Sequence, residues 1–252
     1  MNIKQEIIDF YNLTNNNLFP RKEQYLQSHD CNGKPLFLQT MSVTQQKKVT
    51  HNNKHIKVAL EYSEPNGFPI LKPYNGTIGY DYISYGKHYH HTGRGECVDF
   101  FCDDYIFEKA CDWNLTRTTY RLKDFDCLMS PDYSLYVDAS IQDNKAAIYK
   151  SRLAGAYWQY WGFNVIPTAS WSDVDSFNYC FEGLPLHSVI AVCGVGVSWC
   201  SYSTRLWQYG MREIEQQLQP TTIIVYGSNL EVPGLQTPVT FIQDNISKRF
   251  RG

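Results

Sequence analysis

The sequence lacks any run of apolar residues long enough to cross a membrane, which takes about 18 to 20 in succession. Its amino-terminal stretch, MNIKQEIIDFYNLTNNN, mixes acids and bases and has no apolar centre, so we expect no secretory signal peptide. The eight cysteines include no C-x-x-C pair, which excludes the common zinc-finger and iron–sulfur spacings. We therefore expect a cytoplasmic protein with reduced thiols and no membrane partner.

Short catalytic motifs are missing as well. The chain contains no G-x-S-x-G, no G-x-x-x-x-G-K-[ST], no H-E-x-x-H and no G-x-G-x-x-G, so the common hydrolase, NTPase, zinc-protease and dinucleotide sites have no support. Charge is also scarce, because charged residues make up 19% of the chain and the net charge is −2. No overall positive field draws nucleic acid to this protein, which leaves only a local basic patch for such a partner.

Apolar and aromatic residues, in contrast, are plentiful. They make up 43% and 15% of the chain, enough for one large domain or for a core domain with an added lobe. The segment SEPNGFPILKPYNG holds three prolines and two glycines and predicts a boundary. We predict an N-terminal extension over residues 1–75, with a hairpin in VTQQKKVTHNNKHIKVALEY, followed by an α/β core domain over residues 76–252.

From Thr77 onward, short apolar runs alternate with helical patterns. The runs typical of strands are TIGYDYI, CVDFFC, FDCLMS, FNVIPTAS, SVIAVCG, TTIIVYG and VTFIQ. Helical patterns separate them, at about Asp104–Trp113, Lys145–Trp161, Asp173–Phe181 and Thr204–Leu218.

The strand pattern indicates the fold class. Several runs, SVIAVCG and TTIIVYG above all, are apolar on both faces, as buried parallel strands are. Strand–helix–strand repetition then predicts right-handed βαβ units around a mainly parallel sheet. With seven strands and four clear helices, an incomplete or irregular TIM-like barrel fits best, and an open doubly wound sheet is the alternative.

Both architectures place ligands at the carboxyl ends of the parallel strands, and polar side chains gather there. The amino ends carry turn residues and no comparable cluster. This asymmetry predicts a polar pocket at one mouth of the sheet. The candidate residues are Asp103, Asp104 and Tyr105 after CVDFF; Asp132 and Ser134 after FDCLM; Ser170, Trp171 and Asp173 after NVIPT; and Tyr226 after TTIIV.

Several of these candidates also have a purely structural interpretation. Either Asp103 or Asp104 is suited to cap the helix that follows, although one cap suffices. Ser172 and Asp175 fit the capping pattern S-x-x-D. Asp132, within SPDYS, is suited to closing a turn.

The segment GKHYHHTGRGE clusters three histidines ahead of the first acidic strand: His88, His90 and His91. Histidine clusters can bind metal ions, but adjacent histidines in a loop are more often exposed, so we assign no metal ligand. Lys87 and Arg94 in the same loop offer positive charge to an anionic ligand instead.

Five runs together resemble a domain-of-unknown-function family that is common in bacteria, phages and mobile elements. They are VDFFCDDYIFEKACDW, FDCLMSPDYSLYVD, YKSRLAGAYWQYWGFNVIPTASWSDVDSFNYCFEGLP, SVIAVCGVG and TTIIVYG, which span roughly Thr77 to Gly227. The resemblance implies a cytoplasmic, phage- or plasmid-linked α/β domain and brings no characterised activity. Motifs resembling F-F-x-D-D-Y, S-P-D-x-S and P-T-x-S-W-S-D recur together in that family and correspond here to Asp103, Asp104, Asp132, Ser134, Ser170 and Asp173.

Our first hypothesis is an enzyme with an acidic, hydroxyl-rich pocket. Adjacent acids in a partly buried mouth raise one pKa, so Asp103 and Asp104 would be an acid/base or cation-binding pair, with Asp132 as a second acid. The predicted ligand is a nucleotide or other phosphorylated small molecule, with Mg²⁺ as the cofactor considered. The predicted substrate-contacting residues are Tyr105, Ser134, Ser170, Trp171, Asp173 and Tyr226.

The alternative is a non-catalytic binding module that sequesters a small ligand or contacts nucleic acid or a host protein. Its basic features are QQKK, HNNKH and SKRFRG. A third hypothesis makes the acids helix caps and ion-pair partners and places the function in the N-terminal extension. The sequence predicts no oligomeric state.

Overall fold

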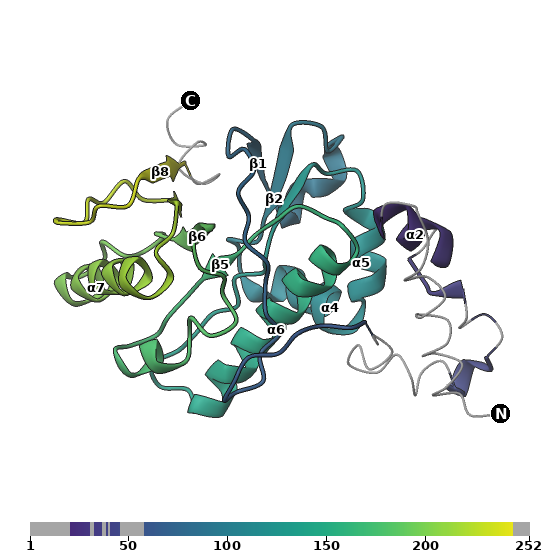
Figure 1. Ribbon diagram of the computed structural model, residues 1–252, viewed down its shortest axis with the longest axis horizontal. Helices are drawn as coiled ribbons and strands as arrows, with labels where there is room; N and C mark the ends of the chain where they lie inside the picture. Colours follow the sequence, from purple (N-terminus) through teal and green to yellow (C-terminus); the bar gives the residue numbers. More distant parts are fainter. Residues whose placement is uncertain (1–20, 31–32, 37–38, 40, 46–57, 244–252) are drawn as a thin grey trace.

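In the computed structural model, the residues described are 21–30, 33–36, 39, 41–45 and 58–243 (Figure 1). The predicted hairpin falls largely outside them, as do the QQKK, HNNKH and SKRFRG features in whole or in part. The described elements are, in chain order, α2 (Arg21–Ser28), β1 (Asp81–Ser84), the 3₁₀ helix η3 (Tyr85–His90), β2 (Glu96–Asp99), α4 (Asp104–Trp113), α5 (Leu115–Arg121), β3 (Cys127–Met129), α6 (Ile141–Tyr160), β4 (Val165–Ile166), β5 (Thr168–Ala169), the 3₁₀ helix η4 (Asp175–Asn178), β6 (Val189–Cys193), α7 (Ser201–Leu218), β7 (Thr222–Tyr226) and β8 (Val239–Ile242).

All seven predicted strands are present, and the fourth is divided into β4 and β5. They form two four-stranded sheets with the orders β1-β2-β3-β4 and β5-β6-β7-β8, and every pairing is parallel. The predicted mainly parallel α/β class is therefore confirmed. Both orders are sequential, without the reversal that creates the switch point of a doubly wound sheet. Among the described strands, β1 and β8 each pair on one side only, so no closed barrel is observed.

Pro167 explains why the fourth strand is divided. Proline has no N–H group to donate to a ladder, so the pairing with β3 stops there. The Ser130 hydroxyl accepts a hydrogen bond from the Thr168 amide at 2.8 Å, and the Ser130 carbonyl accepts one from the Thr168 hydroxyl at 2.8 Å. The Pro167 carbonyl accepts from the Ala191 amide of β6 at 2.8 Å. The chain thereby passes from one sheet to the other at a single residue.

Three of the four predicted helices are present. α4 has the predicted bounds, and α7 begins a few residues early, at Ser201. α6 begins at Ile141 because the Ser140 side chain accepts from the Asp143 amide at 3.1 Å, a typical N-cap. The predicted helix over Asp173–Phe181 is wrong, because only the short 3₁₀ helix η4 forms there. The helix α5 was not predicted.

The two faces of the sheets enter different cores. Val98, Leu128 and Val165 pack against α4, α5 and α6, whereas Ile190 and Ile223 pack against α7. Figure 1 shows the corresponding division, with α4–α6 beside the first sheet and α7 beside the second. Successive side chains of a strand point to opposite faces of the sheet, so the residues next to these in each strand face away from the helices. Those neighbours form one apolar core that both sheets share: Cys97, Cys127, Met129, Ile166, Val189, Ala191, Ile224 and Tyr226.

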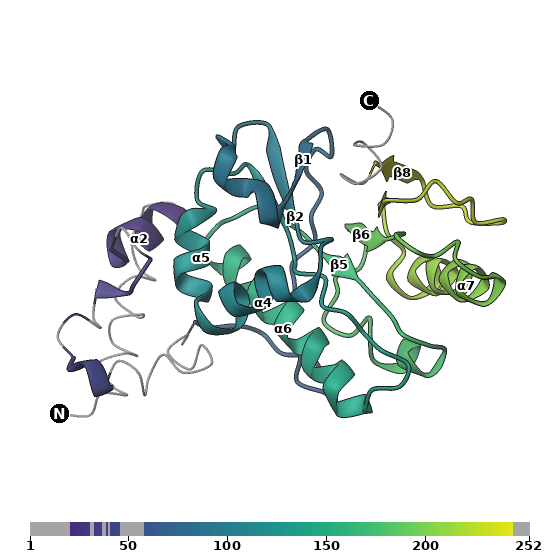
Figure 2. The same cartoon turned by 180° about the vertical axis from the view of Figure 1, so that it is seen from behind.

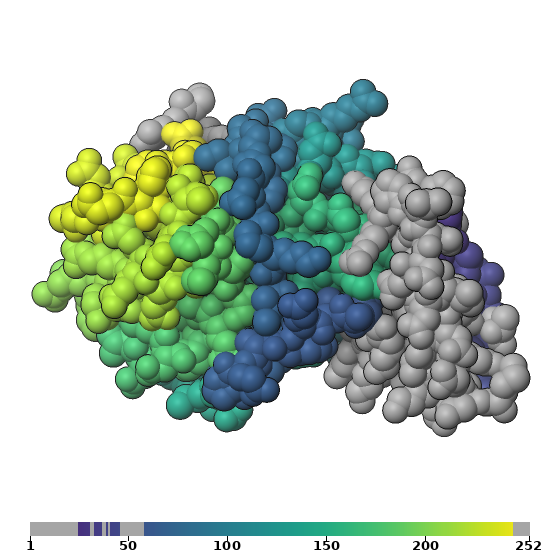
Figure 3. Space-filling model, viewed as in Figure 1, coloured from purple at the N-terminus to yellow at the C-terminus, as the bar shows by residue number. Residues whose placement is uncertain are grey.

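The segment before β1 belongs to the packed structure. Figure 3 shows it as a blue band that crosses the front of the molecule between the two halves. Phe68, Leu71 and Tyr74 are buried there, and Tyr74 enters the core shared by both sheets. The Tyr74 carbonyl also accepts from the Val189 amide at 2.9 Å, which fixes the segment beside β6.

None of the described cysteines forms a disulfide, and four of them are buried, namely Cys97, Cys111, Cys127 and Cys180. They act as small apolar side chains, as expected from their positions in strands and helices. Among the described helices, none combines the length and the apolar character that a bilayer crossing requires.

Candidate functional site

A cavity of about 370 Å³ lies where β3, β5 and β6 end. The chain segments that leave these strands form most of it, and the first turns of α7 close one side. The lining residues are Asp132, Tyr133, Ser134, Leu135, Tyr136, Ala169, Ser170, Trp171, Cys193, Val195, Val197, Ser203, Leu206 and Trp207. Four of the nine predicted site residues therefore share one cavity: Asp132, Ser134, Ser170 and Trp171.

Asp132 is the acid of this cavity with the most altered environment. Its Oδ1 atom is buried and has no hydrogen-bond partner among the described residues. Burial raises the pKa of the Asp132 carboxyl to about 8, and the negative charge of Asp104 adds to the rise. The positive charge of Arg152 and a hydrogen bond from Ser170 oppose it. The carboxyl is therefore mostly protonated at neutral pH.

Arg152, on α6, is the cation behind this carboxyl, and it is almost fully buried. Its guanidinium donates to the carbonyls of Thr168 at 3.1 Å, Cys180 at 2.8 Å and Glu182 at 3.3 Å. Burial lowers the pKa of Arg152 to about 10, so it keeps its charge at neutral pH. Within the described residues no carboxylate lies at ion-pair distance from it, and its field acts on Asp132 without direct contact.

Asp104 borders the cavity through Ser134. Both carboxylate oxygens accept from the Ser134 amide, at 3.1 and 3.3 Å, and Oδ1 also accepts from the Ser134 hydroxyl at 3.0 Å. Burial raises the pKa of Asp104, and the charge of Glu108 adds to the rise, while the Ser134 bonds and Lys150 oppose it. The first turn of α4 is thus fastened to the segment that carries Asp132.

Two indoles form the apolar wall. Trp207 donates its Nε1–H to the Cys193 carbonyl at 3.0 Å, which ties α7 to the end of β6. Trp171 lies against α7 at Gly210, where a Cβ atom would come within 2.2 Å of the indole ring. Glycine at this position is what allows the helix to approach so closely.

Asp103 and Tyr105 lie outside this cavity. Asp103 occupies the N-cap position of α4, where its exposed side chain makes no capping hydrogen bond. Tyr105 is 77% exposed and lines a different cavity. The structure therefore separates the neighbours Asp103 and Asp104, because only the second contacts the segment after β3.

Asp173 and Tyr226 are also elsewhere. The Asp173 carboxylate accepts from the Ser176 amide at 2.8 Å and so closes the turn that leads into η4. Tyr226 is buried at the end of β7, where its ring stacks on Phe101 with centroids 5.0 Å apart. It belongs to the core that both sheets share rather than to the cavity.

The histidine segment forms η3 and does not converge on a point. His88 is buried, its ring stacks on Tyr85 with centroids 4.6 Å apart, and burial lowers its pKa. His91 instead contacts the Glu96 carboxylate at 2.7 Å. In the part of the chain that the structure describes, no group of three or more His, Cys, Asp or Glu side chains is placed to hold a metal ion.

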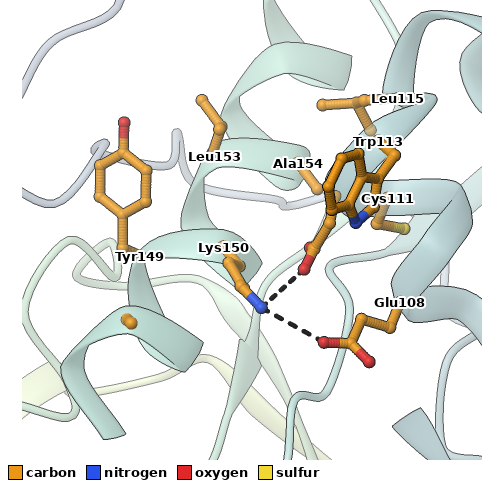
Figure 4. Close-up of a pocket in the computed structure, with 10 residues that line it drawn as sticks. Glu108, Cys111, Trp113, Leu115, Tyr149, Lys150, Leu153 and Ala154 are labelled. Atoms are coloured by element: carbon orange, nitrogen blue, oxygen red, sulfur yellow. Dashed lines mark hydrogen bonds and ion pairs between the residues drawn. The ribbon is translucent and has the colours of Figure 1, made fainter. Parts of the chain in front are cut away.

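A larger cavity, of about 530 Å³, lies between α4 and α6 (Figure 4). Its walls are mostly apolar, with Leu153 and Trp113 among them. Lys150 crosses it and contacts Asp112 at 2.6 Å and Glu108 at 3.5 Å. Its charged groups are thus engaged with one another, and none of the predicted site residues lines it.

Sequence reasoning missed several residues of the site. Arg152 was available as a signal, because it is a cation inside a helix rich in alanine and aromatic residues. Ser203 and Trp207 gave no such signal, since only the packing of α7 brings them to the cavity.

Comparison with known proteins gives the following matches. Residues 60–242 match the model of the family described as Domain of unknown function (DUF4417). The Gene 1 protein of Mycobacterium phage L5 is 32% identical over 176 residues, which are 69% of this chain and 76% of that protein. The Gene 1 protein of Mycobacterium phage D29 is 34% identical over 134 residues, 53% of this chain and 49% of that protein. No solved structure matches.

Proposed function

The chain belongs to the family Domain of unknown function (DUF4417), and we propose that its cavity at the ends of β3, β5 and β6 is a small-molecule site equipped for acid–base chemistry. The predicted resemblance to such a family is confirmed. Both relatives named above are phage proteins, in line with the predicted link to phages and mobile elements. Because the family supplies no activity, the proposal is built on the residues of the cavity.

One observation carries it: two acids with different environments border the same cavity. A general acid works best when its pKa lies near the working pH, and burial raises the pKa of Asp132 to about 8. Asp104, fastened by Ser134, supplies the negative charge that adds to this rise. Pairs of carboxyl groups in unequal environments mark acid and base roles in many enzymes. We assign proton donation to Asp132 and charge stabilisation to Asp104.

The lining suggests the ligand class. A volume of about 370 Å³ suits a molecule of nucleoside size. The indole of Trp171 offers an apolar surface, and the hydroxyls of Ser134 and Ser170 offer hydrogen bonds. No Lys or Arg is among the described lining residues, so a phosphate group would depend on Ser203 and the amino end of α7. We propose a nucleoside-like ligand, with a nucleotide as its phosphorylated form.

The donor set does not favour a resident Mg²⁺. A protonated Asp132 is a poor ligand for a cation, and both oxygens of Asp104 already accept hydrogen bonds from Ser134. Magnesium prefers ionised carboxylates and substrate phosphates. The proposed chemistry therefore does not use Mg²⁺, which is added only as a component of the binding experiment.

Thermal unfolding with nucleosides and nucleotides, each with and without Mg²⁺, tests the site. A ligand at about 100 times its dissociation constant stabilises the folded state by about 2.7 kcal/mol. For a chain of this size that raises Tm by about 5 to 10 °C. We expect such a shift for the wild type and a shift about half as large in Ser170→Ala, which removes one hydrogen-bonding hydroxyl from the lining.

Asp103→Asn is the matched control, because it removes a neighbouring carboxylate that lies outside the cavity. It should respond to ligand as the wild type does. If no compound shifts the wild-type Tm, or if Asp103→Asn loses the shift while Ser170→Ala keeps it in full, the proposed site is wrong. If the site only binds its ligand, the wild type and Asp132→Asn both bind it and neither converts it. If the site is catalytic, the wild type converts the ligand, and Asp132→Asn binds the ligand without converting it.

We further propose that the two sheets are parts of one incomplete barrel of the singly wound type. Support comes from the sequential strand orders, from the junction at Pro167 and from the core that both sheets share. An experimental structure in which the two sheets do not enclose that core would contradict this arrangement.

A further inference from the structure

A second concave surface lies among η3, α4 and α5, away from the cavity described above. It encloses about 380 Å³. Three cations line it: Lys109 from α4, and Arg117 and Arg121 from α5. Three tyrosines line it, and two of them are exposed: Tyr89 to 62% and Tyr105 to 77%. None of its described lining residues is acidic.

The cations are available to an outside anion. In the described part of the chain, none of Lys109, Arg117 and Arg121 has a carboxylate within ion-pair distance. The acids of α4 recur every fourth residue on another face of that helix, where Glu108 and Asp112 contact Lys150. Charge on α4 is therefore segregated, with its basic residue turned toward α5, which lies beside it in Figure 2.

The aromatic part of the surface is partly preorganised. Arg121 donates to the Tyr89 hydroxyl at 3.1 Å and lies over its ring, 5.6 Å from the centroid. The Tyr89 ring also packs on buried His88, with centroids 3.9 Å apart. A large aromatic ring that is held in place yet more than half exposed is suited to stacking against a flat partner.

From this arrangement we propose that the surface among η3, α4 and α5 binds single-stranded nucleic acid. The three cations neutralise backbone phosphates, and Tyr89 and Tyr105 stack on unpaired bases. Cationic grooves with exposed aromatic side chains are the usual design of single-strand binding sites. Bases of a duplex are already stacked on each other, so the two tyrosines favour single strands. The proposal is independent of the chemistry at Asp132.

Fluorescence anisotropy with a labelled single strand of about 12 nucleotides, of DNA and of RNA, measures the binding over a range of salt. Each phosphate contact to a single strand contributes about 0.7 to the slope of log K against log salt. Lys109→Ala combined with Arg117→Ala should lower the slope by about 1.4 and weaken binding about 60-fold at about 50 mM salt. Tyr105→Ala should weaken binding about tenfold and leave the slope unchanged.

Lys72→Ala combined with Arg205→Ala is the matched control, because both cations are exposed and lie outside η3, α4 and α5. This variant should bind the strand as the wild type does. All substituted surface side chains are exposed, and an unchanged Tm reports that the variants fold. Equal affinity for duplex and single strand, wild-type binding by the Lys109/Arg117 variant, or binding only to anionic lipid vesicles would each overturn the proposal.

Discussion

Replacing Asp132 by asparagine should change how the stability of this protein depends on pH. In the folded state burial raises the pKa of Asp132 to about 8, whereas in an unfolded chain the same carboxyl titrates near its ordinary value of 3.8. Between these values the folded state holds a proton that the unfolded state releases. The free energy of unfolding therefore falls as the pH rises, because protons favour the state that binds them.

The size of the effect follows from the gap between the two pKa values. Each unit of pH within the gap changes the free energy of unfolding by about 1.4 kcal/mol for one group. From about pH 4 to about pH 7 the wild type should lose about 4 kcal/mol through Asp132 alone. The contribution is fully present below about pH 4 and is exhausted above about pH 8. Asparagine has no proton to release, so Asp132→Asn should lack this slope.

Urea unfolding followed by tryptophan fluorescence is a suitable assay, since the chain has six tryptophans. Wild type, Asp132→Asn and Asp103→Asn are compared from about pH 4.5 to about pH 7.5, where the linear extrapolation gives each free energy. The Asp132→Asn variant should gain on the wild type as the pH rises, by about 4 kcal/mol in total. Asp103→Asn, at an exposed carboxylate, should run parallel to the wild type. Parallel profiles for wild type and Asp132→Asn would refute the protonated carboxyl and, with it, the role assigned to this residue.

Two further substitutions test the surroundings of the cavity. Arg152→Met leaves the carbonyls of Thr168 and Cys180 without a buried donor and should destabilise the fold by about 2 kcal/mol or more. It also removes the charge that lowers the pKa of Asp132, so carboxyl NMR titration should find that pKa above the wild-type value; no rise would contradict the coupling. Gly210→Ala places a Cβ atom within 2.2 Å of an indole and should lower the urea midpoint, since overpacking costs about 1–3 kcal/mol against a gain of about 1 kcal/mol in helix propensity. A urea midpoint above that of the wild type would contradict this, because it would mean that α7 can move away from the Trp171 indole without cost.

The strands were predictable because their signal is local. A run such as SVIAVCG carries apolar residues on both faces of the strand. In the structure one face packs against α7 and the other enters the core that both sheets share, so both faces are buried. The bounds of α4 were also predictable, because its apolar positions Phe107 and Cys111 recur at helical spacing after a polar start. The helix expected over Asp173–Phe181 failed because Asp173 and Ser176 bond to each other's backbone, and such bonds compete with helix formation.

The site was only partly predictable. Position at a strand end indicated Asp132, Ser134, Ser170 and Trp171, because the carboxyl ends of parallel strands meet along one edge. The same argument could not sort Asp103 from Asp104, which are neighbours in the sequence. Their difference arises where α4 packs beside the segment after β3, so that only the second carboxylate meets Ser134.

By itself, the sequence determined the parallel α/β class, the positions of the strands along the chain and the edge at which polar side chains collect, since these depend on periodicity and on chain direction. The order of the strands in the sheets came only from the structure. Tertiary structure alone decided which carboxyl group of the cavity has its pKa raised to about 8, because desolvation depends on what surrounds an atom in space. It also decided that Tyr89 and Arg121, far apart in the sequence, share one exposed basic surface. Both proposed activities depend on such long-range neighbours, which no local pattern encodes.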